Sequence, residues 1–148
     1  MELTKITTED FHNKLKEIKT KDQITITKSD IFHGIAVQGL YLFGVDLSSI
    51  SFRGCFMEKL KIRNCDFRGC DFSGAIIKQV TIDHSVFDDA NFTESQISMA
   101  EIRNSCLRNT IFHHAILKGV DIKSSDVSGI NIQCSSLQYV HTLNIKVD

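Results

Sequence analysis

The sequence predicts an all-β solenoid, in which the chain turns through four sides per coil around a packed interior. Every fifth residue from Leu42 to Leu137 is large and apolar, at all 20 positions. The residue two places before each of these, from Leu40 to Ser135, is neither charged nor aromatic. Each of the 21 charged residues between Leu40 and Leu137 lies at one of the other three positions of the pentad. Two of every five side chains are therefore expected to point into a dry interior.

A period of five residues matches neither the 3.6 of an α-helix nor the 2 of a β-strand. The chain must therefore turn once per pentad, and four such sides close into a coil of about 20 residues. Residues spaced by one coil form columns of similar side chains: Phe52, Phe72, Phe92, Phe112 and Ile132 in one, and Leu42, Ile62, Ile82, Ile102 and Ile122 in another. Similar side chains stacked about 4.8 Å apart pack well as ladders.

The segment before the repeats is expected to cap the solenoid, because an open end exposes apolar side chains and unpaired backbone. Thr7–Asp10 resembles the N-cap and first turn of a helix over about residues 8–20. Phe11, Leu15 and Ile18 would form its apolar stripe and cover the first coil.

Three regions follow from these patterns. The N-terminal cap comprises residues 1–39 and also contains an alternating segment, Gln23–Thr27, that predicts a short strand. Asp30 occupies a position where a small buried residue is expected, so the first coil should be irregular. The repeat proper occupies residues 40–139, and residues 140–148 form a C-terminal strand or tail.

The carboxyl end shows no helical cap. The pentad loses its apolar centre at Thr142, and the residues that follow alternate over a short tail. The inward side chains of the last coil are called the last rung here. They could be covered by a second copy of the chain across a two-fold axis, or by the tail of the same chain folded back over them. We expect a homodimer whose edge includes Leu137, Tyr139, Leu143, Ile145 and Val147.

The segments Asn64–Ala75 and Asp89–Phe92 resemble the pentapeptide repeat proteins, whose consensus is A(D/N)LXX, and the resemblance covers about residues 40–139. The resemblance implies a right-handed quadrilateral β-helix of about five coils. It also implies a bacterial protein with one of two functions. Some members protect DNA gyrase from quinolones or peptide toxins as dimers that mimic DNA. Others are effectors or scaffolds that bind proteins.

Composition narrows the function further. A formal charge of −1, from 17 basic and 18 acidic residues, argues against direct nucleic-acid binding. No apolar run is long enough to span a membrane. The start of the chain lacks the order of a signal peptide, and five cysteines at irregular spacing favour reduced thiols, so we expect a cytoplasmic protein.

No catalytic residue, cofactor or metal site is expected. A filled coil with flat or convex sides and no insertion between residues 40 and 139 offers no pocket, so we expect no enzyme activity. The coil places His84 and His114 on different corners, where they do not share a metal ion. The cysteines divide into an inward set, Cys55, Cys65 and Cys70, and an outward set, Cys106 and Cys134.

One outward face is rich in charge. It carries Asp46, Asp66, Arg68, Asp88, Arg108 and Asp126. Arg68, Asp88 and Arg108 follow one another at coil spacing, and such ladders are usually surface ion pairs of small energetic value. The arginines interrupt the negative charge, which argues against DNA mimicry because a duplex carries an unbroken row of phosphates.

Another face carries apolar residues where the family usually has Asp or Asn. Phe56, Ile76 and Ile116 share one stripe, next to Lys78 and Lys118. Contiguous exposed apolar area tends to mark an interaction surface, although scattered apolar residues are also common on surfaces. The sequence therefore favours a protein-binding scaffold with an unknown protein partner, followed by gyrase protection and then by a secreted bacterial effector.

Overall fold

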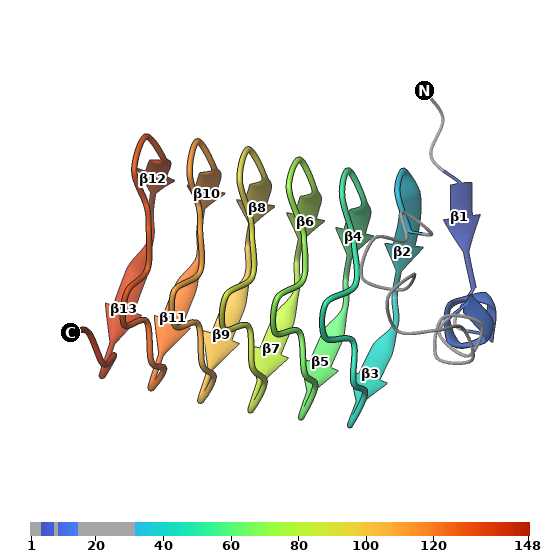
Figure 1. Ribbon diagram of the computed structural model, residues 1–148, viewed down its shortest axis with the longest axis horizontal. Coiled ribbons are helices and arrows are strands. Elements are labelled where there is room, and N and C mark those ends of the chain that lie inside the picture. The colour runs from blue at the N-terminus through green and yellow to red at the C-terminus, as the bar shows by residue number, and fades with distance from the viewer. Residues whose placement is uncertain (1–3, 8, 15–31) are drawn as a thin grey trace.

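The computed structural model describes residues 4–7, 9–14 and 32–148, which form a stack of parallel coils (Figure 1). Each coil has four sides, two made of short strands and two held by single bridges to the neighbouring coils. The described residues contain no helix that is long and apolar enough to cross a membrane. The predicted β-solenoid is confirmed.

The strands form two parallel sheets on adjacent sides of the stack. The first contains β1 (Thr4–Ile6), β2 (Ile35–Gln38), β4 (Phe56–Glu58), β6 (Ile76–Lys78), β8 (Gln96–Ser98), β10 (Ile116–Lys118) and β12 (Ser136–Gln138). The second contains β3 (Tyr41–Phe43), β5 (Lys61–Arg63), β7 (Thr81–Asp83), β9 (Glu101–Arg103), β11 (Asp121–Lys123) and β13 (His141–Leu143). Leu42 pairs with Ile62 and Ile62 with Ile82, so a coil is 20 residues long, as predicted.

The corners are made by a left-handed residue in each pentad. Every fifth residue from Gly34 to Asn144 has a positive φ, between 48° at His84 and 70° at Gly39. Glycine adopts this conformation without strain, and most other residues adopt it at some cost. The regular corner explains why the chain changes direction at a fixed interval.

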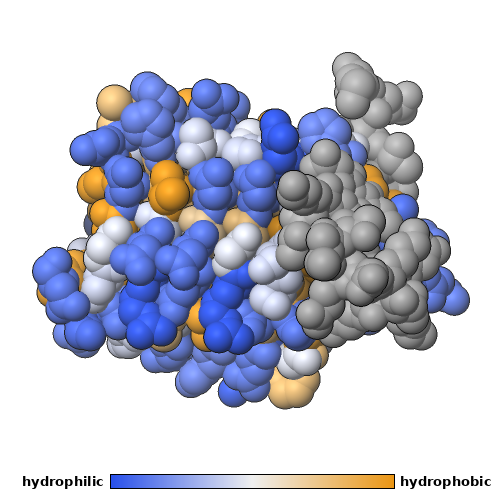
Figure 2. All heavy atoms as spheres, in the orientation of Figure 1, coloured by the Kyte–Doolittle hydropathy of each residue, from blue (hydrophilic) through white to orange (hydrophobic). Residues whose placement is uncertain are grey.

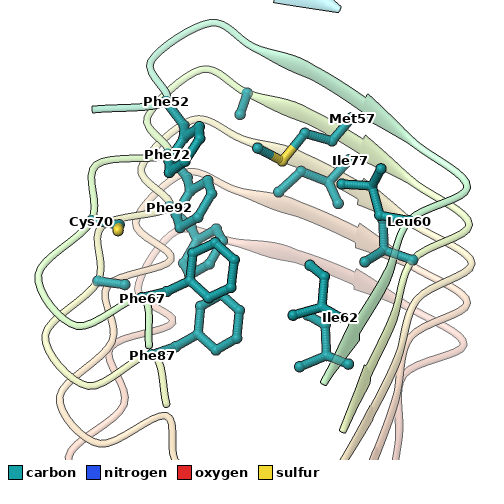
Figure 3. Close-up of a cluster of buried hydrophobic side chains, with 14 of the residues drawn as sticks. Phe52, Met57, Leu60, Ile62, Phe67, Cys70, Phe72, Ile77, Phe87 and Phe92 are labelled. Carbon is teal, nitrogen blue, oxygen red and sulfur yellow. The ribbon is translucent and has the colours of Figure 1, made fainter. Parts of the chain in front are cut away.

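The lumen is filled by stacked side chains (Figure 3). Phe72 stacks on Phe52 at 5.1 Å and on Phe92 at 4.7 Å between ring centroids, with nearly parallel planes. Phe67 and Phe87 form a second stack at 4.6 Å. These separations are close to the spacing of about 4.8 Å between neighbouring strands, so one aromatic ring per coil fills its column without a gap.

Small inward residues complete the interior at the corner between the second sheet and the next side. The backbone N–H of Ser85 donates to the hydroxyl of Ser105 at 3.1 Å, and Ser105 donates to Ser125 in the same way. Each of these hydroxyls donates in turn to the carbonyl oxygen two residues earlier. A small polar residue is therefore accepted inside because the ladder satisfies its hydrogen bonds.

The described N-terminal residues include the start of the expected helix. Residues 9–14 are helical, and Thr7 is the N-cap, because its hydroxyl accepts from the Asp10 N–H at 3.1 Å while the Asp10 carboxylate accepts from the Thr7 N–H at 3.0 Å. Phe11 is buried against Phe32 at 5.0 Å. The rest of the expected helix, the strand expected at 23–27 and Asp30 lie outside the described residues.

Two features place the first coil earlier than residue 40, where we expected the repeat to begin. Phe32 stacks on Phe52 at 5.0 Å and extends the aromatic column by one coil. β2 pairs with β4 in the regular register, and β1, a strand that the sequence did not predict, pairs with β2. The sheet therefore continues into the cap, with β1 as its outermost strand (Figure 1).

The C-terminal end continues the coil, although we expected the pentad register to end there. β13 pairs with β11, which places Thr142 over Ile122, and Lys146 forms a bridge to Asp126. Backbone pairing needs no apolar side chain, so the coil persists where the apolar centre is lost. No residue between 32 and 148 folds back over the last rung.

Candidate functional site

The apolar stripe lies on the outer surface of the first sheet. Phe56 is paired with Ile76, but Gln96 lies between Ile76 and Ile116 in the register. Phe56 and Ile76 are half-buried, whereas Ile116 is 47% exposed. Phe56 and Ile76 are therefore adjacent in the stripe, and Gln96 separates them from Ile116.

Lysines flank this stripe. Lys78 Nζ lies 5.7 Å from the centre of the Phe56 ring, within the range of a cation–π contact. Lys118 is exposed beside Ile116, at the far end of β10. An apolar strip with cationic borders is suited to a partner that offers apolar and acidic side chains.

The charged face is hollowed instead of flat or convex. An open hollow is lined by Asp46, Asp66, Arg68, Asp88 and Arg108, together with six neighbouring residues. In Figure 2 the side of the molecule turned toward the viewer is mostly hydrophilic, with apolar residues visible between the polar ones. Asp126 lies in the Asp66 column, joined to it through Val86 and Cys106.

The ion pairs of this face match the expected ladder in part: Arg108 pairs with Asp88 of the neighbouring coil, as expected, but Arg68 does not. Arg68 Nε donates to Asp66 within its own coil at 2.9 Å, and hydrogen bonding by Arg68 lowers the pKa of that carboxyl. Arg108 reaches across to the preceding coil, where its Nε and its backbone N–H each donate to Asp88 at 2.9 Å. Asp88 is buried and Arg108 is exposed, so this pair joins two coils at the surface with its carboxylate shielded from solvent.

Two exposed aromatic residues lie on the second sheet, outside the candidate surfaces predicted from the sequence. Tyr41 and Phe43 lie on β3, and each is more than half exposed. Their rings stack at 6.3 Å, and they pair in register with Lys61 and Arg63 on β5. Exposed aromatic residues beside arginine are common at protein interfaces. The signal in the sequence was the aromatic character of both outward positions of one pentad.

The expected dimer edge lies at the open end of the solenoid. Leu137 and Val147 occupy inward positions, and both side chains are exposed. Tyr139 and Leu143 are exposed on the outside of the last coil. Ile145 differs from the expectation, because it is half-buried and packs against the core.

The cysteines follow their assigned positions. Cys55 and Cys70 are buried, and burial raises the pKa of each thiol to about 12. Burial also raises the pKa of Cys65. Cys106 is half-buried and Cys134 is exposed. The inward thiols are therefore protonated and chemically inert at neutral pH.

The structure brings together a histidine and cysteine cluster that the sequence analysis did not combine. His84 lies 2.9 Å from Asp83. His113, His114 and Cys134, however, offer ligand atoms that all lie within 4.8 Å of one another. The coil length of 20 residues was the available signal, because it places Cys134 directly over His114.

The interior offers little room for a substrate. The cavity within the lumen measures about 40 Å³ and is lined by apolar residues, including Phe52, Phe72 and Phe92. Small-molecule sites typically measure about 300–1,000 Å³ and place a few polar groups around the ligand. The surfaces that remain for function are the outer sides and the open end.

The repeats match a known family model. The family model described as pentapeptide repeats matches residues 41–79 with eight copies, and the same pentad corner recurs to Asn144. Residues 41–79 of the chain are therefore pentapeptide repeats. A search of curated protein sequences finds no match to the chain.

Several solved structures are similar to this chain. Rfr23 from the cyanobacterium Cyanothece 51142 is 13% identical, with 76% of this chain and 88% of that chain covered and a TM-score of 0.38. QnrB1, a plasmid-mediated fluoroquinolone resistance protein, is 12% identical, with 79% and 86% covered and a TM-score of 0.49. A pentapeptide repeat protein from the Arabidopsis thaliana thylakoid lumen is 20% identical, with 70% and 60% covered and a TM-score of 0.44.

Proposed function

We propose that the protein is a non-catalytic scaffold that pairs with a second copy of itself through its C-terminal coil and binds another protein on its outer sides. The observation that carries this proposal is the exposure of the last rung. Leu137 is 46% exposed, although the same pentad position is buried in every coil from Leu42 to Val127. Burial of such residues is the main driving force of association.

The backbone at this end supports pairing with a second copy. β12 and β13 are the last strands of their sheets, so each presents an unpaired edge. Unpaired edges invite further strands, and a two-fold axis allows both edges to be covered by the same surface of a partner copy. The dimer would be a longer rod that displays each outer face twice.

Sedimentation analysis of a Leu137→Glu variant tests this pairing. We expect a dimer for the original protein and a monomer for the variant, because the charge would be buried in the interface. Ile116→Glu is the matched control, since Ile116 is 47% exposed on the outer side of β10 and should leave the dimer intact. A monomeric original protein, or equal effects of both substitutions, would contradict the proposal.

The apolar stripe of the first sheet is the proposed partner surface. We expect Ile76→Asp combined with Ile116→Asp to abolish binding of a partner identified from lysate and then purified. The Leu137→Glu variant is the control, because it alters the open end and leaves the stripe unchanged. Equal binding by the doubly substituted protein would exclude this surface.

Protection of a topoisomerase by DNA mimicry is the second-ranked function. It needs a continuous row of negative charge along the rod. Arg68 and Arg108 pair with Asp66 and Asp88, so the most acidic face is locally neutralised. The charge pattern therefore supports the scaffold over the DNA mimic.

A further inference from the structure

His113, His114 and Cys134 form a compact cluster of metal-ligand side chains near the C-terminal end. Their ligand atoms lie within 4.8 Å of one another, and the two imidazole rings are 4.1 Å apart between centroids. His113 is half-buried, and the other two residues are exposed. A tetrahedral zinc ion with bonds of about 2.0–2.3 Å holds its ligands roughly 3.5 Å apart, a distance that small side-chain rotations would reach.

The coil backbone holds these three residues in place. Phe112, directly before the histidines, is buried in the aromatic column, and its N–H donates to Asn131 at 2.7 Å. The His114 N–H donates to the carbonyl oxygen of Gln133, the residue before Cys134, at 3.2 Å. Successive coils are therefore in register here, so the cluster does not depend on a flexible loop.

The cluster differs from two other described histidines, His84 and His141. His84 Nδ1 lies 2.9 Å from Asp83, and His141 Nδ1 lies 3.1 Å from Asp121, so each already has a carboxylate partner. The side chains of the cluster make no hydrogen bond or ion pair with the described residues, and the only interaction between its rings is their edge contact. Their donor atoms are therefore available to a ligand.

We propose that His113, His114 and Cys134 bind a divalent transition-metal ion of the zinc class. Imidazole nitrogen and thiolate sulfur are the preferred zinc ligands, and the absence of a carboxylate from the cluster makes magnesium or calcium a poor fit. On binding, the Cys134 thiol releases its proton to solvent. Three protein ligands leave one tetrahedral position for water. The ion would join the last two coils and stabilise the open end.

Cobalt titration under reducing conditions tests the site, because cobalt replaces zinc and a thiolate ligand adds a near-ultraviolet charge-transfer band. We expect one equivalent to bind per chain. Cys134→Asn should remove that band and lower the affinity by more than about 10-fold, the loss that follows removal of even an outer-shell partner. Asparagine is chosen because Cys134 has a φ of 58°, a conformation that asparagine tolerates.

His84→Asn is the matched control, since His84 is also an exposed corner histidine with a positive φ. It should bind cobalt as the original protein does. His113→Gln provides a second test at a position without positive φ, in case a corner substitution impairs folding. The proposal is overturned if cobalt gives no thiolate band, if Cys134→Asn binds equally well, or if binding requires two chains per ion in sedimentation analysis.

Discussion

The two ends of the solenoid differ in how their terminal strands and inward side chains are covered. At the N-terminal end, β1 extends the first sheet, and Phe11 and Phe32 continue the aromatic column beyond Phe52. At the C-terminal end, β12 and β13 are the last strands, and Leu137 is left partly exposed. Within the described residues, the inward side chains are buried at the first end, whereas Leu137 is partly exposed at the second.

The difference between the two ends follows from the number of neighbours that each coil has. Each coil contacts only its neighbours, so stability is approximately a sum of coil and interface contributions. Central coils have two neighbours and bury their rungs completely. A terminal coil has one neighbour, which leaves apolar surface that a cap or a partner must cover.

The largest expected effect is the introduction of charge into the aromatic column. Phe92→Asp should prevent folding, because Phe92 is buried between Phe72 and Phe112 and the carboxylate would have no partner there. Circular dichroism would show loss of β structure. Ile132→Asp, in the same column but exposed at the open end, should remain folded. A folded Phe92→Asp protein would contradict the packed column.

Truncation at the two ends should have unequal effects. Phe11→Ala should lower the free energy of unfolding by about 3 kcal/mol, because it leaves a cavity over Phe32. Leu137→Ala should lower it by only about 1 kcal/mol, because that side chain is partly exposed in the single chain. Denaturant unfolding at low protein concentration measures both. Equal losses would mean that the C-terminal rung is covered within one chain.

Thiol labelling compares the ends without substitutions. In the presence of a chelator, Cys134 should react at least about 100-fold faster than Cys55, because burial raises the pKa of Cys55 to about 12 and suppresses its thiolate. Mass spectrometry of labelled peptides gives the two rates. Similar rates would show that the first coils open readily.

The smallest expected effect is on the pH dependence of the last coil. A hydrogen bond from His141 lowers the pKa of Asp121, and one from Ser128 lowers the pKa of Asp126, each from 3.8. The stabilisation is therefore present above pH 3.8 and is lost as the pH falls through the lowered values. Hydrogen exchange should show reduced protection of β13 in that range. Asp121→Asn should reduce this pH dependence, and an unchanged response would show that the pair does not hold the coil.

The sequence predicted the coil because its signal is repeated in every pentad. The columns that contain Phe72 and Ile82 were read correctly, and so was the burial of Cys55, since burial depends on position within the pentad. β1 was missed because three residues are too few to show a period, and Phe32 because Asp30 suggested an irregular coil.

The candidate surfaces were predicted only in part, because contacts between coils depend on side-chain reach. Arg68 and Arg108 occupy equivalent positions, yet one pairs within its coil and the other pairs with the preceding coil. Asp88 was expected on an exposed face and is buried beneath Arg108. Equivalent positions in a repeat therefore need not have equivalent partners.

The number of residues per coil, the residues that face inward and the pentapeptide repeats could be predicted from the sequence alone. They could be predicted because a stack of similar units repeats each requirement, so the pattern exceeds local noise. The tertiary structure was needed to see how the ends are covered and which charged groups pair. It was also needed to see that His113, His114 and Cys134 lie close together. These features depend on single contacts across neighbouring coils, which occur once and leave no period to detect.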